Sequence, residues 1–126
     1  MRAVDTNLLV RIMVRDDPHQ AARADRFIQS GGWVSLVVLA EAMWVLTSTY
    51  QRTNEDIAAV VEMLLKHEHL VFQDEDAVTA AAIRFRARPS LGFRDCLILE
   101  LARKAGFLPL GTFDRRLAKV NGALMV

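Results

Sequence analysis

The strongest constraint on the fold is the alternation of short apolar runs with longer helical patterns. The runs lie at Val4, Trp33-Val34-Ser35, Leu70-Val71-Phe72 and residues 107–110, with a last one at Ala123-Leu124-Met125. A helical pattern separates each run from the next, so helices must connect consecutive strands. Strands connected in this way lie parallel. The sequence therefore predicts an α/β fold with a parallel sheet.

Capping residues mark the expected helix ends. Asp17-Pro18 is typical of a helix start, and Gly31-Gly32 of a helix stop. Thr53 and Asp74 stand before two further helical patterns, and Gly106 follows the helix expected over residues 93–105. Other helices are expected over residues 7–15 and 36–50, with a short one after Asp114.

The composition favours a single domain spanning residues 1–126. The chain has 126 residues, of which 52% are hydrophobic, which suits one core and argues against disorder. The best candidate for a membrane span, residues 33–46, is too short and contains Glu41. No signal-peptide pattern precedes Asp5, and the single cysteine, Cys96, excludes an intrachain disulfide. We therefore expect a cytoplasmic protein without a membrane segment.

Four acidic residues stand at the ends of core elements or inside them: Asp5, Glu41, Asp95 and Asp114. Asp5 and Asp114 follow apolar runs, and in a parallel sheet such carboxyl ends meet at one edge. Asp95 begins an apolar helix, where the helix dipole favours an anion. Converging carboxylates repel one another unless a hard divalent cation joins them. The pattern predicts a Mg²⁺ or Mn²⁺ site.

Glu41 is the acid that is hardest to explain otherwise. Helical spacing places it in an apolar stripe with Val37 before it and Val45 after it. A glutamate buried there must be paired, protonated or bound to a metal ion. The alternative for Glu41 is an ion pair with an arginine, and for the three aspartates it is the capping of the next helix.

Four segments resemble the PIN-domain ribonucleases, and among them the VapC-like toxins of toxin–antitoxin pairs. The resemblance covers nearly the whole chain, with the segments in the right order. The segments are Val4-Asp5-Thr6-Asn7-Leu8-Leu9-Val10-Arg11, Ser35-Leu36-Val37-Val38-Leu39-Ala40-Glu41, Gly92-Phe93-Arg94-Asp95-Cys96-Leu97-Ile98 and Leu110-Gly111-Thr112-Phe113-Asp114-Arg115-Arg116-Leu117.

The resemblance implies a three-layer α/β/α sandwich with a central parallel sheet of four or five short strands. It also implies an endoribonuclease that hydrolyses RNA phosphodiester bonds with Mg²⁺ or Mn²⁺. Asp5 and Asp95 match the family's chief metal ligands, and Glu41 and Asp114 match its other acids. We expect Glu41 and Asp114 to bind the ion through water or to orient the attacking water. VapC-like proteins are usually homodimers that a cognate antitoxin protein silences, so we expect both partners.

The motifs also suggest supporting residues and one departure from the family. Thr112 matches a hydroxyl two residues before the last acid, and Thr6 and Asn7 are expected to orient Asp5. Some family members carry a further acid near the third motif, where Arg94 and Cys96 flank Asp95 here. The next acid, Glu100, lies at a poor helical angle, so one firmly bound metal ion is expected.

Arginine dominates the positive charge of the chain. Thirteen of the sixteen basic residues are arginine, which grips phosphate with two parallel hydrogen bonds. A genome rich in G and C would produce the same bias. We expect Arg11, Arg86 and Arg94 to contact RNA phosphates.

Other functions fit the sequence less well. His67-Glu68-His69 has a strand-like spacing that could hold zinc, but the segment follows a helical pattern and fits a solvated helix end better. A haloacid-type phosphatase would need an acid where Asn7 stands, and a receiver domain would need an acidic pair at the first strand. A PIN-like module that binds RNA or protein without cutting remains the main alternative.

Overall fold

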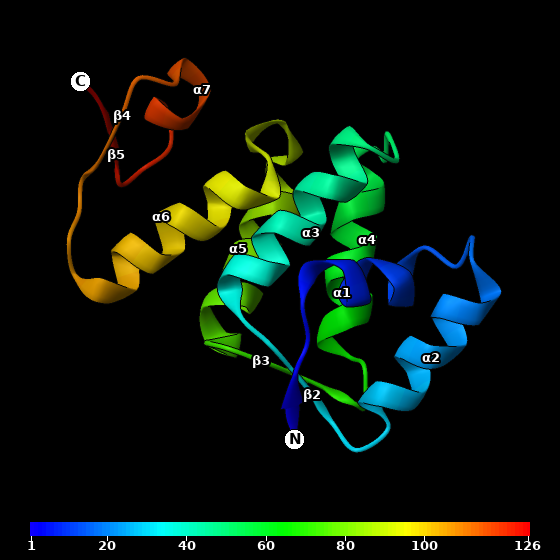
Figure 1. The fold of residues 1–126 in the computed structure, drawn as a ribbon. Helices are drawn as coiled ribbons and strands as arrows, with labels where there is room; N and C mark the ends of the chain where they lie inside the picture. The colour runs from blue at the N-terminus through cyan, green and yellow to red at the C-terminus, as the bar shows by residue number, and fades with distance from the viewer.

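A computed structural model describes residues 1–126 and confirms the α/β class, with parallel strands alternating with helices (Figure 1). The strands are β1 (Arg2–Ala3), β2 (Gly32–Val34), β3 (Leu70–Phe72), β4 (Leu110–Thr112) and β5 (Ala123–Met125). The helices are α1 (Thr6–Met13), α2 (Pro18–Ile28), α3 (Leu36–Ser48), α4 (Asn54–Leu65), α5 (Glu75–Ala87), α6 (Phe93–Ala105) and α7 (Arg115–Ala118), with the 3-10 turn η1 (Pro89–Leu91) before α6.

The five strands form two parallel sheets instead of one central sheet. One sheet has the order β1-β2-β3, and the other pairs β4 with β5. Figure 1 shows β4, α7 and β5 together beside α6 and away from the first sheet. The cause lies in α7, because Leu117 and Val120 are buried and α7 contacts η1, which holds this C-terminal unit beside the helices.

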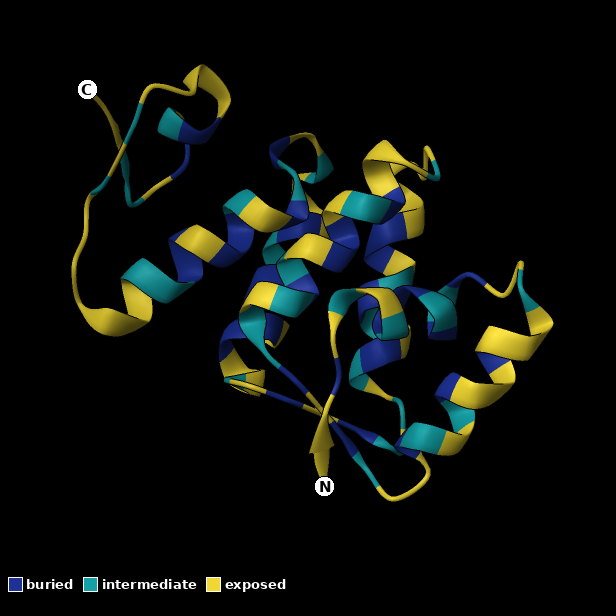
Figure 2. Cartoon of the chain, in the orientation of Figure 1, coloured by how far each residue is buried: buried dark blue, intermediate teal, exposed yellow.

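Helices cover one face of the β1-β2-β3 sheet. Val34, Leu70 and Phe72 point into the core, whereas Trp33 and Val71 alternate with them and are 38% and 44% exposed. Figure 2 shows the same alternation of buried and exposed positions along these strands. The second face therefore lacks the outer layer that a complete three-layer sandwich would provide.

The largest helix–helix interface joins α5 to α6. The rings of Phe85 and Phe93 meet edge to face with centroids 6.0 Å apart. Arg84 Nε donates to Glu100 Oε1 at 2.7 Å, so the one buried charged residue of the core is paired. This interface fixes the position of the first turn of α6.

The expected capping residues are confirmed. At the start of α2, α4 and α5, the side chains of Asp17, Thr53 and Asp74, respectively, each accept a hydrogen bond from a backbone amide. Gly106 follows α6 in the left-handed conformation and ends that helix. The fourth strand begins three residues later than expected, after Pro109, which has no amide to donate to a neighbour.

No helix of the structure is long and apolar enough to cross a membrane.

The start of α5 offers a stability test. Asp74 Oδ1 accepts from the Ala77 amide and from Lys104 Nζ at 2.6 Å, so it caps α5 and ties it to α6. We expect Asp74→Ala to lower the free energy of unfolding by about 1–2 kcal/mol. Asp74→Asn keeps the cap and suits the positive φ of this position, so it should cost less. Urea unfolding at pH 7 measures both.

The same residue gives a pH dependence. The hydrogen bond from Lys104 lowers the pKa of Asp74 below its usual 3.8. Because the folded-state pKa is the lower one, the stabilisation is complete at neutral pH and is lost as the pH falls through that folded pKa. The difference between wild type and Asp74→Asn should therefore disappear in strong acid. A difference that persists there would contradict the ion pair.

Candidate active site

Asp5 stands at the junction of β1 and α1. It is the N-cap of α1, and its Oδ1 accepts from the Leu8 amide at 2.9 Å. The capping interpretation is thus confirmed, but the cap occupies only one carboxylate oxygen. The side chain is exposed, with Thr6 half-buried and Asn7 exposed after it. The second oxygen of Asp5 is therefore free to bind a cation from solvent.

Asp114 stands at the equivalent junction of β4 and α7. Its Oδ1 accepts from the amides of Arg116 at 2.8 Å and Leu117 at 3.1 Å. The Asp114 amide in turn donates to Thr112 Oγ1 at 3.0 Å, which fixes the turn after β4. Asp114 is exposed and, like Asp5, keeps one oxygen free.

Asp95 lies in the first turn of α6. The N-cap of this helix is Gly92, whose φ of 83° suits glycine and which offers no side chain to the helix amides. Burial raises the pKa of Asp95 above its usual range, and the negative charge of Asp114 raises it further, while Arg94 acts in the opposite direction. The structure therefore brings Asp95 and Asp114 close enough to repel each other.

Glu41 corrects one expectation. It is exposed, as is Val37 one turn earlier, so the buried apolar stripe assigned to this face of α3 was wrong. The face of α3 that enters the core carries Leu39, Ala42, Met43 and Leu46 instead. Apolar residues surround α3 on most sides, so periodicity could not identify the buried side. Glu41 lies in an apolar groove between α3 and α6, together with Arg94.

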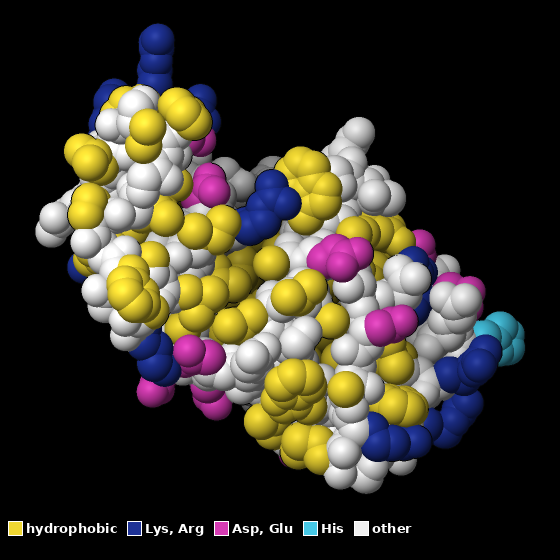
Figure 3. Space-filling model, turned by 60° about the vertical axis from the view of Figure 1, so that its left-hand side comes forward, with side chains coloured by type: hydrophobic (Ala, Val, Ile, Leu, Met, Phe, Trp, Pro, Cys, Tyr) yellow, Lys and Arg dark blue, Asp and Glu magenta, His cyan; other side chains and the backbone are white.

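The four acids do not form one cluster within a single chain. No group of three or more Asp, Glu, His or Cys side chains lies close enough together to hold a metal ion. Figure 3 shows acidic side chains dispersed over one face of the molecule. Asp95 and Asp114 interact electrostatically, and both offer the hard oxygen atoms that Mg²⁺ prefers. The rest of the ligand set is incomplete because β4, which leads to Asp114, does not pair with β1, which leads to Asp5.

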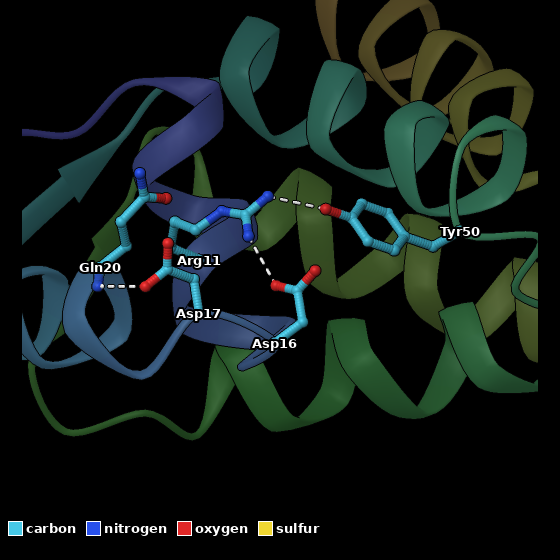
Figure 4. Close-up of polar contacts among 5 residues, drawn as sticks. All are labelled: Arg11, Asp16, Asp17, Gln20 and Tyr50. Atoms are coloured by element: carbon cyan, nitrogen blue, oxygen red, sulfur yellow. Dashed lines mark hydrogen bonds and ion pairs between the residues drawn. The ribbon is translucent and has the colours of Figure 1, made fainter.

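The three predicted phosphate-binding arginines differ in their surroundings. Arg11 donates to Tyr50 Oη at 2.7 Å and to Asp16 Oδ1 at 2.6 Å, which ties α1 to the end of α3 (Figure 4). Arg86 pairs with Glu62 of α4. Contacts of Arg11 and Arg86 with RNA stay predictions, and both side chains already hold elements together. Arg94 is the one beside the acids.

Trp44 is a candidate site residue that lies outside the four family motifs. Its indole is 51% exposed, and the Arg94 guanidinium lies 4.9 Å from the ring centroid. Both side chains, with Thr47, Asn54 and Asp95, line a cavity of about 180 Å³. An exposed aromatic ring beside an arginine can stack an unpaired base. In the sequence, the only indication of this role is that Trp44 lies outside the face of α3 that enters the core.

Glu100 is not part of this site. It is buried and accepts from Arg84 on α5, and Arg103 Nε lies 3.7 Å from its second oxygen. Its negative charge is thus compensated within α5 and α6.

Comparison with known families decides the membership of the chain. Residues 2–123 match the family model of the PIN domain. The chain belongs to the PIN-domain family. PIN domains are mostly metal-dependent ribonucleases, and all four acids of this PIN domain lie within the matched residues. Comparison with curated proteins finds no match.

The coupling of Asp95 and Asp114 can be measured directly. We expect Asp114→Asn, which preserves the cap of α7, to lower the pKa of Asp95 in metal-free protein, because it removes a neighbouring negative charge. Carbon-13 NMR of the aspartate carboxyls reports this shift. Asp17→Asn makes the same change at the cap of α2 and should leave Asp95 unaffected.

The sign of the accompanying stability change follows from the raised pKa. The folded state holds the Asp95 proton more tightly than the unfolded state does, so stability falls as the pH rises through the folded-state pKa. Asp95→Asn should therefore raise the Tm of metal-free protein at pH 7. A lower Tm would show that the carboxylate is stabilised at the start of α6.

Proposed function

We propose that this PIN domain is a Mg²⁺- or Mn²⁺-dependent endoribonuclease that hydrolyses RNA phosphodiester bonds. The observation that carries the proposal is the match of residues 2–123 to the PIN domain, a family of mostly metal-dependent ribonucleases, with all four acids inside the matched range. Burial and the negative charge of Asp114 both raise the pKa of Asp95, and a divalent cation beside these carboxylates would relieve that cost.

Each acid has a proposed role. Asp5 and Asp95 hold the metal ion directly, and Glu41 and Asp114 bind it through water or orient the attacking water. Thr6, Asn7 and Thr112 orient these carboxylates. When bound, the ion lowers the pKa of its water and polarises the phosphate.

Arg94 and Trp44 supply substrate contacts in this proposal. Arg94 stands between Asp95 and the exposed indole of Trp44, so it can hold a phosphate while the ring stacks an adjacent base. The proposed substrate is therefore unpaired or looped RNA, whose bases are free to leave a helix.

The proposal also assigns the biological role of a VapC-like toxin. This assignment is based on the resemblance of the four motifs to those toxins. It implies three further proposals: a cognate antitoxin protein, a homodimer and a cytoplasmic location. The apolar groove between α3 and α6, with Val37 exposed in it, provides a surface that a protein partner can cover.

Cleavage of RNA tests the catalytic part. We expect Asp5→Asn to lower the Mg²⁺-dependent cleavage rate by more than the roughly 10–100-fold that loss of an outer-sphere partner costs. Asparagine keeps the cap of α1, so circular dichroism should not change. Asp17→Asn is the matched control, because it makes the same exchange at the cap of α2. Equal rates in wild type and Asp5→Asn would refute the assignment.

A module that binds RNA or protein without cutting is the second candidate, and the exposed Trp44 beside Arg94 favours it as well. Titration calorimetry with Mn²⁺ separates the two. The nuclease should bind about one ion per site, more weakly in Asp95→Asn and unchanged in Asp74→Asn. Absence of Mn²⁺ binding, together with retained affinity for single-stranded RNA, would favour the binding module.

A further inference from the structure

The outer edge of β1 has no partner. The Arg2 amide donates to the carbonyl of Gly31, just before β2, and the Val4 amide donates to the carbonyl of Trp33 in β2. Backbone groups alternate in direction along a parallel strand, so the amide and carbonyl of Ala3 point away from β2. Ala3 is exposed, and β1 is the end strand of its sheet. The amide and the carbonyl of Ala3 are thus free to form hydrogen bonds with another strand.

The outer edge of β4 is open in the same way. The Leu110 amide donates to Gly122, and the Thr112 carbonyl accepts from Val126, so both residues face β5. The amide and carbonyl of Gly111, between them, point to the opposite side. A two-stranded sheet is marginally stable by itself, and β4 and β5 have no third strand.

Apolar side chains surround both open edges. On the C-terminal unit, Phe107 and Phe113 are 79% and 82% exposed, and Leu124 is 55% exposed. Beside β1, Trp33 and Val71 are exposed on the uncovered face of the sheet. Figure 3 shows hydrophobic side chains over the C-terminal lobe and in the hollow between it and the rest of the molecule. So much uncovered apolar surface marks an interface.

The C-terminal unit is anchored to its own chain away from β1. Leu117 and Val120 are buried, and α7 contacts η1. Arg103 of α6 donates to the Asn121 carbonyl at 3.1 Å. Pairing β4 with its own β1 would break these contacts. A second copy can reach the free edge without breaking them.

We propose that two copies of this chain form a closed dimer in which β4 of each copy pairs in parallel with β1 of the other. Each half then contains a five-stranded sheet, in the order β3-β2-β1 from one copy and β4-β5 from its partner. The two pairings are related by a two-fold axis, so neither copy retains an open edge.

The exchange has a consequence for the active site, which rests on the proposed function. Neighbouring parallel strands bring their carboxyl ends together. Asp5 follows β1 and Asp114 follows β4, so the partner copy places its Asp114 beside Asp5. The dimer thereby completes a set of acids that one chain leaves dispersed.

A single proline tests the edge pairing. Ala3→Pro removes only the outward amide of β1, because the β1–β2 hydrogen bonds come from Arg2 and Val4. Light scattering should show a dimer for wild type and for Ala3→Thr, and a monomer for Ala3→Pro with an unchanged circular dichroism spectrum. A wild-type monomer, or a dimer that survives Ala3→Pro, would overturn the proposal.

Mixed dimers test the shared site. Asp5→Asn and Asp114→Asn chains should each cleave RNA at least about 10-fold more slowly than wild type when expressed alone. Co-expression should restore about a quarter of wild-type activity, because half of the dimers are mixed and one of their two sites is intact. No recovery would contradict the shared site. If wild type itself were inactive, the result would count against the proposed function alone. The pairing of β4 with β1 between chains would then be tested by cross-linking.

Cross-linking between chains is independent of activity. Ala3→Cys and Gly111→Cys chains are co-expressed and treated with a short bismaleimide. The native Cys96 is fully buried, and burial raises its pKa to about 11, so it does not compete. The proposal predicts a covalent dimer from the mixture and none from either variant alone. The proposal is overturned if the mixture gives no covalent dimer. It is also overturned if a chain that carries both Ala3→Cys and Gly111→Cys is cross-linked only within itself.

Discussion

The packing of α5 against α6 is the constraint on which the rest of the site depends. It buries the edge-to-face contact of Phe85 and Phe93 and the ion pair of Arg84 with Glu100. Phe93 is the first residue of α6, so this contact fixes the turn that carries Asp95. The turn η1 lies between the two helices and holds α7 through contacts that bury Leu117. Burial of apolar surface thus sets the approach of Asp95 and Asp114.

The acids at the starts of α1, α6 and α7 differ in how the backbone stabilises their charge. Asp5 and Asp114 each satisfy the first amides of a helix with one oxygen and leave the other free. A cap stabilises the helix and holds the carboxylate rigidly at the end of a strand, which is what a metal ligand requires. Asp95 has no such compensation and is partly buried, so its charge is the least favourable of the three. In the metal-free protein, the charge of Asp95 therefore costs stability at neutral pH.

Local signals predicted much of this structure. Caps and glycine stops depend on one or two residues, so Asp17, Thr53, Asp74 and Gly106 marked helix ends correctly. Long-range packing was not accessible in this way. The exposure of Glu41, the separation of β4 from β1 and the position of Trp44 over a cavity depend on which faces of α3 and α6 meet. Ion pairs between helices, such as that of Arg86 on α5 with Glu62 on α4, also depend on tertiary contacts.

Crystals of the protein soaked in Mn²⁺ provide the most direct test of the central claim, that these acids form a divalent cation site. Anomalous scattering locates the ion without reference to activity. The account predicts one strong peak per site, coordinated by carboxylate oxygens of Asp5 and Asp95 and close to Asp114. A peak elsewhere, or no peak with all three carboxylates ordered and exposed to the soak, would contradict it.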